Sequence, residues 1–528
     1  INIMRRLIQL GGAEVIHLGH NRSVAEIVEA AIEEDAQAIA VSSYQGGHNE
    51  FFEYMVDMLR ERGAPHIRVF GGGGGVIRPE EIEALEKHGV ERIYDPEHGR
   101  TMGLLGMIDD LLERADYHTI HLPGSDDPSG RGAPLPDPAA LSFEDPAGVA
   151  RAITMTEIGE NAFERIADVV RARADENPAP IVGVTGTGGS GKSSLLDEIV
   201  HRFLVDNADK TVAVLSADPS KRKTGGALLG DRIRMNAIHG PRVYMRSLAT
   251  RDSRTELPST IRDAIAVVRA AGYDLVLVET SGIGQGDTEV IDISDVSLYV
   301  MTAEFGAPTQ LEKIDMLDFA DVVAINKFER KGSEDALRDV RRQMRRSRNA
   351  FDVPLEDLPV YGTIASKFND EGVNGLYAGL VEQISEKRGV RFVCDIAPER
   401  IRRTSSQRSP IPPERMRYLG EIAQTVRGYK RRARELAATA RKRQHLLTAR
   451  AELDGDAPAA LDEKISALEA RLPPEAREML DGYDAERARY QGDELSYRVR
   501  DKDFSVELTS ETLAGTRIPR VIFPDLAD

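Results

Sequence analysis

Residues 181–193 read Ile-Val-Gly-Val-Thr-Gly-Thr-Gly-Gly-Ser-Gly-Lys-Ser, and this stretch decides the fold of the central part of the chain. Its first five residues predict a buried strand, and the GxxxxGKS motif that follows opens a helix from Ser193. The glycines let backbone amides point at phosphate oxygens, Lys192 supplies a fixed positive charge, and Ser193 offers a hydroxyl to Mg²⁺. This order predicts an α/β domain with a catalytic Lys192 and a nucleotide bound by Gly186, Gly188, Gly189, Ser190, Gly191, Lys192, Ser193 and Ser194.

Three carboxylates belong to the same predicted domain. Glu279 ends an apolar run at the carboxyl end of a predicted strand, where open α/β sheets place their ligands. Asp218 ends another strand pattern, and Asp231 lies in the run 230–235. A single acid at a strand end is often only a helix cap, but three near one P-loop favour a metal site. We expect a catalytic Glu279 that reaches the metal or its water, and Arg234 either beside a phosphate or in a surface ion pair.

A second loop, Asn326-Lys327-Phe328-Glu329, follows an apolar strand pattern and indicates a base-binding segment. The Glu329 carboxylate can accept two hydrogen bonds from the N1 and N2 donors of guanine, which adenine does not offer in that arrangement. GTP is therefore favoured over ATP. Loops of this kind usually carry Asp, and Glu329 is one methylene longer. Ser366, which follows the next predicted strand, is expected to lie over the base.

Residues 149–389 resemble the GTPase chaperones of adenosylcobalamin-dependent acyl-CoA mutases. The resemblance is carried by the P-loop, by the DPS at Asp218, by the runs 225–235 and 279–287, and by NKFE. It implies that Arg234 lies near the nucleotide and that Mg²⁺ is held by Ser193, Asp218, Asp231, Glu279 and Thr280.

Two loops of the N-terminal region lack large side chains at predicted strand ends: Ser42-Ser43-Tyr44 and Gly71 to Gly75. Bare loops admit an extended ligand tail between strand ends, although the residues alone favour a flexible turn for each loop. The region resembles the cobalamin-binding domain of the same mutases, whose pattern is DxHxxG, SxL and GG, with Tyr44 here in place of Leu. The resemblance implies adenosylcobalamin as cofactor, held by Ser42, Tyr44, Gly71 and Gly72. It also implies that DxHxxG, with the histidine that ligates cobalt, would immediately precede Ile1.

The order of these segments is similar to that of the fused isobutyryl-CoA mutases, in which chaperone and mutase share one polypeptide. The alternation of short apolar runs with amphipathic stretches is typical of doubly wound parallel sheets. We predict a Rossmann-like cobalamin-binding domain over 1–118, a linker with little to bury over 119–148, a P-loop GTPase domain over 149–395, a helical hairpin over 396–494 and the beginning of the mutase barrel over 495–528.

Composition excludes several classes of protein. The 528 residues carry 87 Asp and Glu against 69 Lys and Arg, a net charge of −18, which argues against a protein that coats nucleic acid or membranes. Residues 401–450 are basic, but their regular apolar seam favours a helix that contacts protein over a nucleic-acid arm. The single cysteine, Cys394, excludes an intrachain disulfide and fits a reducing, cytoplasmic setting. No apolar run approaches the roughly 18 residues of a membrane span.

The residues support a GTPase, and the resemblance implies that its hydrolysis gates cofactor loading and protection. In the intact polypeptide, the resemblance implies a mutase that interconverts isobutyryl-CoA and n-butyryl-CoA. The alternative is a nucleotide-binding regulatory module of another acyl-CoA mutase, with negligible turnover. The expected partners are GTP or GDP, adenosylcobalamin, the mutase barrel and a second copy in a homodimer, with no nucleic acid and no membrane.

Overall fold

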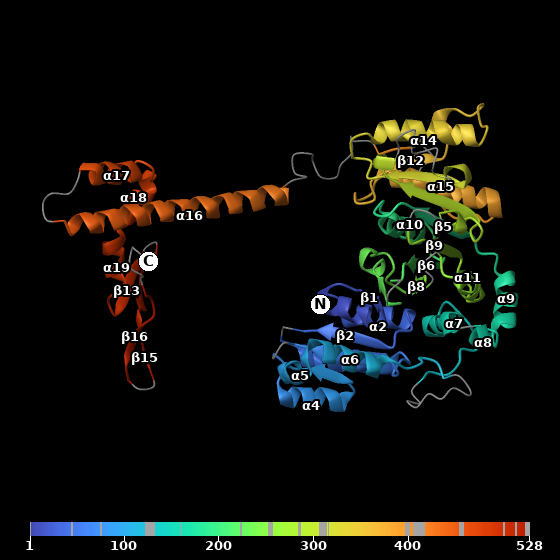
Figure 1. Ribbon diagram of the computed structural model, residues 1–528, viewed down its shortest axis with the longest axis horizontal. Helices are drawn as coiled ribbons and strands as arrows, with labels where there is room; N and C mark the ends of the chain where they lie inside the picture. Colours follow the sequence, from blue (N-terminus) through green and yellow to red (C-terminus); the bar gives the residue numbers. More distant parts are fainter. Residues whose placement is uncertain are drawn as a thin grey trace. The chain divides into compact units, whose positions relative to one another are not determined.

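The computed structural model divides into two units, residues 1–406 and 407–528. It describes residues 2–43, 46–73, 76–121, 132–158, 160–221, 224–251, 257–282, 287–305, 314, 316–395, 402–404, 418–453, 459–499, 502–512 and 515–522. The first unit contains an N-terminal and a central α/β domain, and the second is a set of helices and short hairpins (Figure 1).

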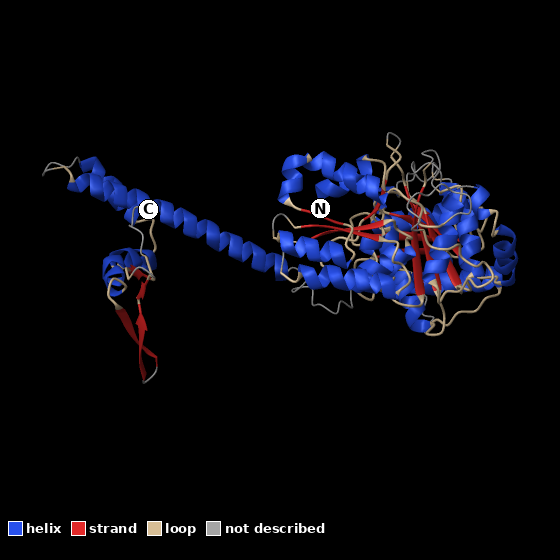
Figure 2. Ribbon diagram, turned by 90° about the horizontal axis from the view of Figure 1, so that it is seen from below, coloured by secondary structure: helices blue, strands red, loops and turns tan. Residues whose placement is uncertain are grey.

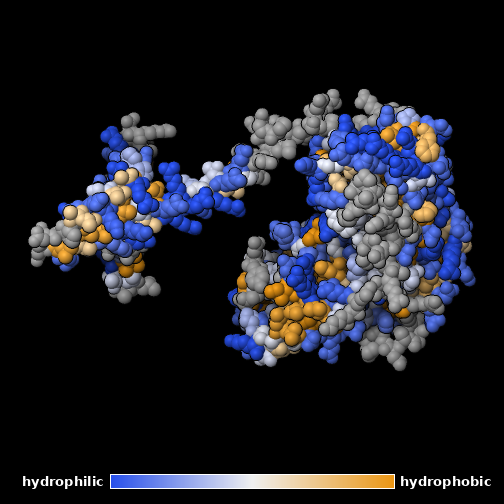
Figure 3. Space-filling model, turned by 45° about the horizontal axis from the view of Figure 1, so that its top comes forward, coloured by the Kyte–Doolittle hydropathy of each residue, from blue (hydrophilic) through white to orange (hydrophobic). Residues whose placement is uncertain are grey.

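The N-terminal domain is built on a parallel sheet with strand order β2-β3-β4. Its helices bury apolar side chains against this sheet, and Phe52, Met55 and Ile93 are fully buried there. The elements are α1 (Asn2–Leu10), β1 (Glu14–Ile16), α2 (Val24–Glu33), β2 (Ala38–Ser42), α3 (His48–Glu61), β3 (Arg68–Gly72), α4 (Pro79–His88), β4 (Arg92–Tyr94), α5 (Pro96–Thr101) and α6 (Gly103–Ala115). Leu104 and Leu105 of α6 are exposed. Figure 3 shows a patch of hydrophobic residues on the surface of the first unit.

The central domain contains a seven-stranded, fully parallel sheet with strand order β12-β11-β10-β5-β9-β6-β8. Its strands are β5 (Ile181–Gly186), β6 (Val212–Asp218), β8 (Val243–Ala249), β9 (Leu275–Glu279), β10 (Val296–Met301), β11 (Val322–Asn326) and β12 (Val360–Thr363). Its helices are α7 (Pro146–Ile158), α8 (Glu160–Phe163), α9 (Ala167–Glu176), α10 (Lys192–Asp206), α11 (Ile261–Ala270), α13 (Met316–Phe319), α14 (Ser333–Ser347) and α15 (Glu371–Arg388). Short 3₁₀ turns lie at Arg232–Arg234, Asp287–Val290, Ala303–Phe305 and Leu355–Asp357.

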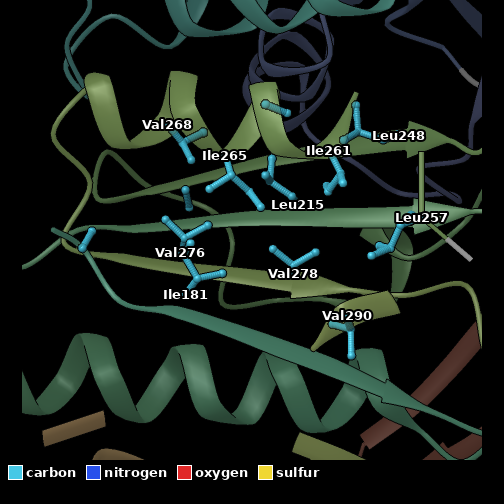
Figure 4. Close-up of a cluster of buried hydrophobic side chains, with 14 of the residues drawn as sticks. Ile181, Leu215, Leu248, Leu257, Ile261, Ile265, Val268, Val276, Val278 and Val290 are labelled. Atoms are coloured by element: carbon cyan, nitrogen blue, oxygen red, sulfur yellow. The ribbon is translucent and has the colours of Figure 1, made fainter. Parts of the chain in front are cut away.

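Helices cover both faces of the central sheet (Figure 2). Every residue of β5, β8, β9, β10 and β11 is buried, as expected for a parallel sheet between two helical layers. On one face, Ile265 and Val268 of α11 lie against Val276 of β9 in the apolar layer of Figure 4. This packing fixes the carboxyl ends of the strands, from which the site residues project.

One pair of strands joins the two α/β domains. β1 of the N-terminal domain pairs in parallel with β7 (Ala227–Leu229) of the central domain, in the register Glu14 with Ala227 and Ile16 with Leu229. The His17 amide extends this ladder by donating to the Leu229 carbonyl oxygen at 3.1 Å. The N-terminal domain therefore holds the segment that leads directly to Asp231.

The structure departs from the sequence-based expectations at two places. In the expected linker, Ala133 and Leu141 are buried, and Arg173 of α9 donates to the Leu141 carbonyl oxygen at 2.8 Å. Strand β8 is not predicted from the sequence, because it contains Arg246, a residue type that is usually exposed. In the structure Arg246 is buried and its charge is paired with Glu157 of α7, which the local sequence does not reveal.

The second unit contains the predicted helical hairpin. α16 (Tyr418–Ala451) packs on α17 (Ala459–Glu469), with Ile465 buried, and Arg443 pairs with Glu469 at 2.8 Å. The apolar seam is only partly used, since Ile422 and Val426 of α16 are exposed within this unit. The other elements are α18 (Pro474–Asp481), α19 (Tyr483–Arg489), β13 (Glu494–Val499), β14 (Lys502–Glu507), β15 (Thr509–Glu511) and β16 (Arg517–Pro519), and the strands form two antiparallel hairpins.

Candidate functional site

The P-loop connects β5 to α10 and curls around the side chain of Lys192. Lys192 begins α10, is buried, and donates from Nζ to the Gly186 carbonyl oxygen at 3.0 Å. Gly191 has a φ of +94°, and a Cβ at this position would lie 2.5 Å from Asn326 Nδ2. A side chain here would therefore be both strained and blocked. The loop holds its lysine pointing back across its own backbone, in the geometry of a phosphate cradle.

Two of the predicted acids converge on the Ser193 hydroxyl. Ser193 Oγ lies 3.0 Å from Asp231 Oδ1 and 2.9 Å from Glu279 Oε1, within donating distance of both oxygens. Ser216 of β6 donates to the other Asp231 oxygen at 2.6 Å. Asp218 lies close by and accepts a hydrogen bond from the Gly230 amide at 2.9 Å. The structure thus brings residues from α10, β6, β9 and the turn after β7 to one point at the mouth of the P-loop.

The electrostatics of this cluster are those of crowded, buried carboxylates. Burial and the neighbouring Asp231 raise the pKa of Glu279 to about 8, and the same two causes raise the pKa of Asp218 to about 6. The charged forms of both groups are therefore disfavoured in the protein alone. A divalent cation bound among them would relieve this repulsion.

Several buried polar atoms around the cluster have no hydrogen-bond partner among the residues that the structure describes. These atoms are Thr187 Oγ1, Ser190 Oγ, Glu279 Oε2 and Ser281 Oγ. Orphaned polar atoms of this kind are normally satisfied by a ligand or by water. Their position beside the P-loop lysine fits a bound nucleotide.

A cation at this point would take few ligands from the protein. The described part of the chain holds no group of three or more His, Cys, Asp or Glu side chains arranged to hold a metal ion by themselves. Mg²⁺ typically uses one or two protein ligands and takes its other oxygens from phosphates and water. The Ser193 hydroxyl and the nearby Asp231 and Glu279 carboxylates fit that requirement.

Asn326 ties the predicted base-binding loop to the P-loop. Its Nδ2 donates to the Ser190 carbonyl oxygen at 2.8 Å, and its Oδ1 accepts from the Thr363 hydroxyl and the Ala365 amide at 3.2 and 3.1 Å. Lys327 donates to the Gly189 carbonyl oxygen at 2.6 Å. The structure therefore brings the loop after β11 and the loop after β12 to the same side of the P-loop.

The remaining predicted nucleotide residues take different positions. Phe328 is buried against Gly362, whereas Glu329 and Ser366 are exposed on the two neighbouring loops. Ser194 is partly buried in the first turn of α10. The side chain of Arg234 is largely exposed, with its guanidinium 3.5 Å from Asp231.

Thr280 follows Glu279 but is engaged elsewhere. Its hydroxyl forms a 2.9 Å hydrogen bond with Thr185, at the end of β5. Its role at a metal thus stays a prediction.

Two residues of the site were not singled out from the sequence. Ser216 fixes Asp231, and its place at the end of β6 could have indicated this. Gly282 has a φ of +67°, and a Cβ there would collide with Lys192 Nζ and lie 2.7 Å from the Gly186 carbonyl oxygen. The backbone after β9 therefore lies directly over the P-loop lysine, which only spatial neighbours reveal.

The carboxyl edge of the N-terminal sheet is bare by comparison. Ser42 and Gly72 are register partners on β2 and β3, and the Ser43 amide donates to the Gly72 carbonyl oxygen at 2.8 Å. A Cβ at Gly71 would collide with Ile93 and lie 2.6 Å from the Phe52 ring, so its small size serves core packing. Among the residues that the structure describes, a Cβ at Gly72 would meet the Tyr94 carbonyl oxygen alone, at 3.5 Å. Tyr44, the fourth predicted cofactor residue, lies outside the described residues.

Comparison with protein families identifies both domains. The model of the methylmalonyl-CoA mutase-associated GTPase MeaB matches residues 149–389, and that of the B12 binding domain matches residues 1–97. The chain thus contains a B12-binding domain and a MeaB-type GTPase domain. The whole chain is similar to fused isobutyryl-CoA mutases: it is 52% identical over 540 residues to that of Geobacillus kaustophilus, and 50% identical to those of Cupriavidus metallidurans and Nocardia farcinica. These matches confirm the resemblance inferred from the sequence.

The matches cover 100% of this chain and 48% of each of these three relatives. The chain therefore spans about half the length of the curated relatives it matches. The P-loop, the acid cluster and the Asn326 loop all fall within the MeaB domain, and Ser42, Gly71 and Gly72 fall within the B12-binding domain. Among the described helices, none is long and apolar enough to cross a membrane.

Proposed function

We propose that the MeaB domain, residues 149–389, binds and hydrolyses GTP with Mg²⁺. The observation that carries this proposal is the convergence of Asp231 and Glu279 on the Ser193 hydroxyl, directly behind the P-loop. Buried carboxylates whose pKa is raised, together with hydroxyls without hydrogen-bond partners around a lysine, are typical of a site that binds a charged ligand and a cation. A nucleotide with its cation supplies both.

The residues divide the work of hydrolysis among them. Lys192, which donates to Gly186 in the protein alone, turns its ammonium to the β and γ phosphates, and the P-loop amides hold the phosphate oxygens. Ser193, Asp231 and Glu279 would hold Mg²⁺, with Asp218 beside them, and the ion would neutralise phosphate charge. Glu279 Oε2, which has no hydrogen-bond partner among the described residues, would accept a hydrogen bond from the attacking water molecule and orient it. All these groups act by placing charge around a transferring phosphoryl group.

Guanine selection is proposed for Glu329. The side chain is exposed on the loop that Asn326 anchors to Ser190, so it is free to meet a base edge. A carboxylate can accept from both N1 and N2 of guanine. Ser366, on the neighbouring loop, would cover the base.

For the B12-binding domain we propose adenosylcobalamin as ligand, with its nucleotide tail between Ser42 and Gly72. The space beside Gly72 supports this proposal: the described residues are not packed against this glycine, so a ligand can lie there. Cobalamin would supply radical chemistry to the whole protein, whereas this domain supplies position.

The similarity to fused isobutyryl-CoA mutases supports a wider proposal. The whole protein interconverts isobutyryl-CoA and n-butyryl-CoA, with GTP hydrolysis gating cofactor loading and protection, in a homodimer. On this proposal residues 495–528 begin the acyl-CoA mutase domain.

The decisive test is phosphate release from GTP by the purified chain with Mg²⁺. Lys192→Ala should lower turnover at least about 100-fold, because the positive charge opposite the γ phosphate is lost. Lys210→Ala is the matched control, since Lys210 pairs with Asp274 outside the site. Unchanged phosphate release in Lys192→Ala would overturn the assignment, and intact GTP binding with no release by the unaltered chain would favour a regulatory module instead.

A further inference from the structure

Arg232 is a buried arginine that directly follows Asp231 in the chain. Its side chain is 2% exposed, and the 3₁₀ turn Arg232–Arg234 begins at this residue. Its Nη2 donates to Glu33 Oε2 at 2.7 Å and to the Met245 carbonyl oxygen at 2.6 Å, and its Nε donates to Glu34 Oε1 at 3.0 Å. A single guanidinium thus joins the turn after β7, strand β8 and the end of α2.

Both carboxylates belong to the B12-binding domain, where their position is unfavourable without Arg232. Glu33 is the last residue of α2 and Glu34 is its C-cap, and negative charge at a helix C-terminus is opposed by the helix dipole. Both side chains are also buried, which costs several kcal/mol for an unpaired charge. The guanidinium therefore holds this end of α2 in place, and α2 holds the guanidinium.

The same end of α2 is fastened to β8 by further hydrogen bonds. Glu34 accepts from the Ser247 amide and from the Ser247 hydroxyl, each at 2.9 Å. The Tyr244 hydroxyl donates to the Glu33 carbonyl oxygen at 2.9 Å. Arg232 therefore sits in a fixed frame and not on a mobile surface loop.

Asp231 lies in the middle of a segment that the B12-binding domain holds on both sides. Before it, β7 pairs with β1, and after it Arg232 binds Glu33 and Glu34. Between these anchors, Asp231 receives hydrogen bonds from Ser193 and Ser216. A shift of the anchors by a fraction of an ångström would move this carboxylate relative to the Ser193 hydroxyl.

We propose that Arg232 is a positioning residue through which the B12-binding domain sets the place of Asp231 in the metal site of the GTPase domain. This inference rests on the proposed function, in which Asp231 helps to hold Mg²⁺. It predicts that loosening the guanidinium weakens the cation site while leaving the phosphate cradle, built by Lys192 and the P-loop amides, intact.

The test measures the affinity of the full chain for a fluorescent GDP analogue across a Mg²⁺ titration and in EDTA. Arg232→Lys keeps the charge but cannot hold both carboxylates and Met245 in the same fork geometry. It should raise the Mg²⁺ concentration needed for half of the Mg²⁺-dependent gain in affinity at least about fivefold, while the affinity in EDTA stays within about twofold of that of the unaltered chain.

Arg251→Lys is the matched control. Arg251 also bridges the domains, from Glu14 of the B12-binding domain to Glu157, but it is not adjacent to a site acid. It should leave the Mg²⁺ requirement unchanged. Glu34→Gln, which keeps size and one acceptor oxygen, should raise the requirement in the same direction, and it carries the test if Arg232→Lys does not fold.

The outcomes separate the two proposals. An unaltered chain whose GDP affinity does not depend on Mg²⁺ would overturn the proposed cation site itself. A Mg²⁺ requirement that is unchanged in folded Arg232→Lys or Glu34→Gln, or that rises equally in Arg251→Lys, would overturn the positioning role alone.

Discussion

The carboxyl edges of the two parallel sheets in the first unit are built in opposite ways. In the GTPase domain, polar side chains at or after the strand ends form this edge. Glu279 of β9 accepts from Ser193, Ser216 of β6 donates to Asp231, and Asn326 of β11 donates to Ser190. Lys192, at the start of α10, donates to Gly186 of β5. In the B12-binding domain, the ends of β2 and β3 carry Ser42, Gly71 and Gly72, and the backbone itself forms the edge.

The difference reflects what each edge is proposed to bind. Phosphates and a cation are compact and charged, so their recognition needs opposite charges fixed by dense hydrogen bonding. A long cofactor tail needs room between strand ends, and small residues provide it. The first edge should therefore fail when one polar side chain is removed, and the second when one side chain is added.

Asn326→Ala tests the side-chain-built edge most severely. The change removes three hydrogen bonds and leaves the Ser190 carbonyl and the Ala365 amide buried and unpaired, at a cost of about 2 to 4 kcal/mol. We expect a lower thermal midpoint of the GTPase domain and at least about tenfold weaker GTP binding. Asn236→Ala, at an exposed position, is the control. If Asn326→Ala matched the control in stability and in GTP binding, this edge would not depend on the Asn326 hydrogen bonds.

Gly71→Val and Gly72→Val, compared as a pair, test the bare edge. A side chain at residue 71 would overpack against Ile93 and Phe52 and should destabilise the chain by about 1 to 3 kcal/mol. At residue 72 there is room, so stability should stay within about 0.5 kcal/mol while adenosylcobalamin binding weakens at least tenfold. Thermal unfolding and a spectroscopic cobalamin titration measure the two effects. Unchanged cobalamin affinity in Gly72→Val would mean that the tail does not pass there.

Glu329→Ala tests whether the edge of the GTPase domain also selects the base. Loss of the charge-assisted pair with guanine should weaken GTP binding by about 1 to 3 kcal/mol and leave ATP binding nearly unchanged. Calorimetric titration with both nucleotides measures this, with the exposed Glu356→Ala as control. An equal loss for GTP and ATP would assign the loop a structural role.

Ser23→Ala should have the smallest effect, because it lies at neither edge. Ser23 caps α2 by accepting from the Glu26 amide, and its loss should cost about 1 kcal/mol. The amide and hydroxyl of Ser23 donate hydrogen bonds to the Glu26 carboxylate and lower its pKa from 4.5 to about 2. The stability that these bonds add to the folded chain is therefore complete above pH 4.5 and is lost as the pH falls through about 2. The difference in thermal midpoint between the variant and the unaltered chain should therefore narrow from pH 7 to pH 3. Ser23→Thr should restore most of it, and a gap that widens in acid would contradict the capping argument.

Local motifs predicted the parts of the site that one stretch of chain determines. The strand, the P-loop and Lys192 follow from thirteen consecutive residues, and Glu279 from the end of a buried strand. The contact of Asp231 with Ser193 could be suspected from the sequence but its geometry could not, because the turn that carries Asp231 is placed by β7, whose strand partner β1 lies more than two hundred residues away. The different roles of Gly71 and Gly72 depend on their neighbours in space, which the sequence does not show. β8 was missed because an arginine within a strand pattern indicates a surface position, whereas Arg246 is buried beside Glu157.

The pairing of β1 with β7 bears on how the chain can be cut. A fragment that begins at the start of the GTPase domain would lack β1, so the edge of β7 that β1 covers would be exposed. The fragment would also lack Glu33 and Glu34, the two carboxylates that pair with Arg232. Free strand edges recruit other chains by the same ladder of hydrogen bonds that β1 now provides. Although the sequence reads as separate modules, an excised GTPase domain would therefore be a self-associating protein, and its solubility depends on a strand encoded by its neighbour.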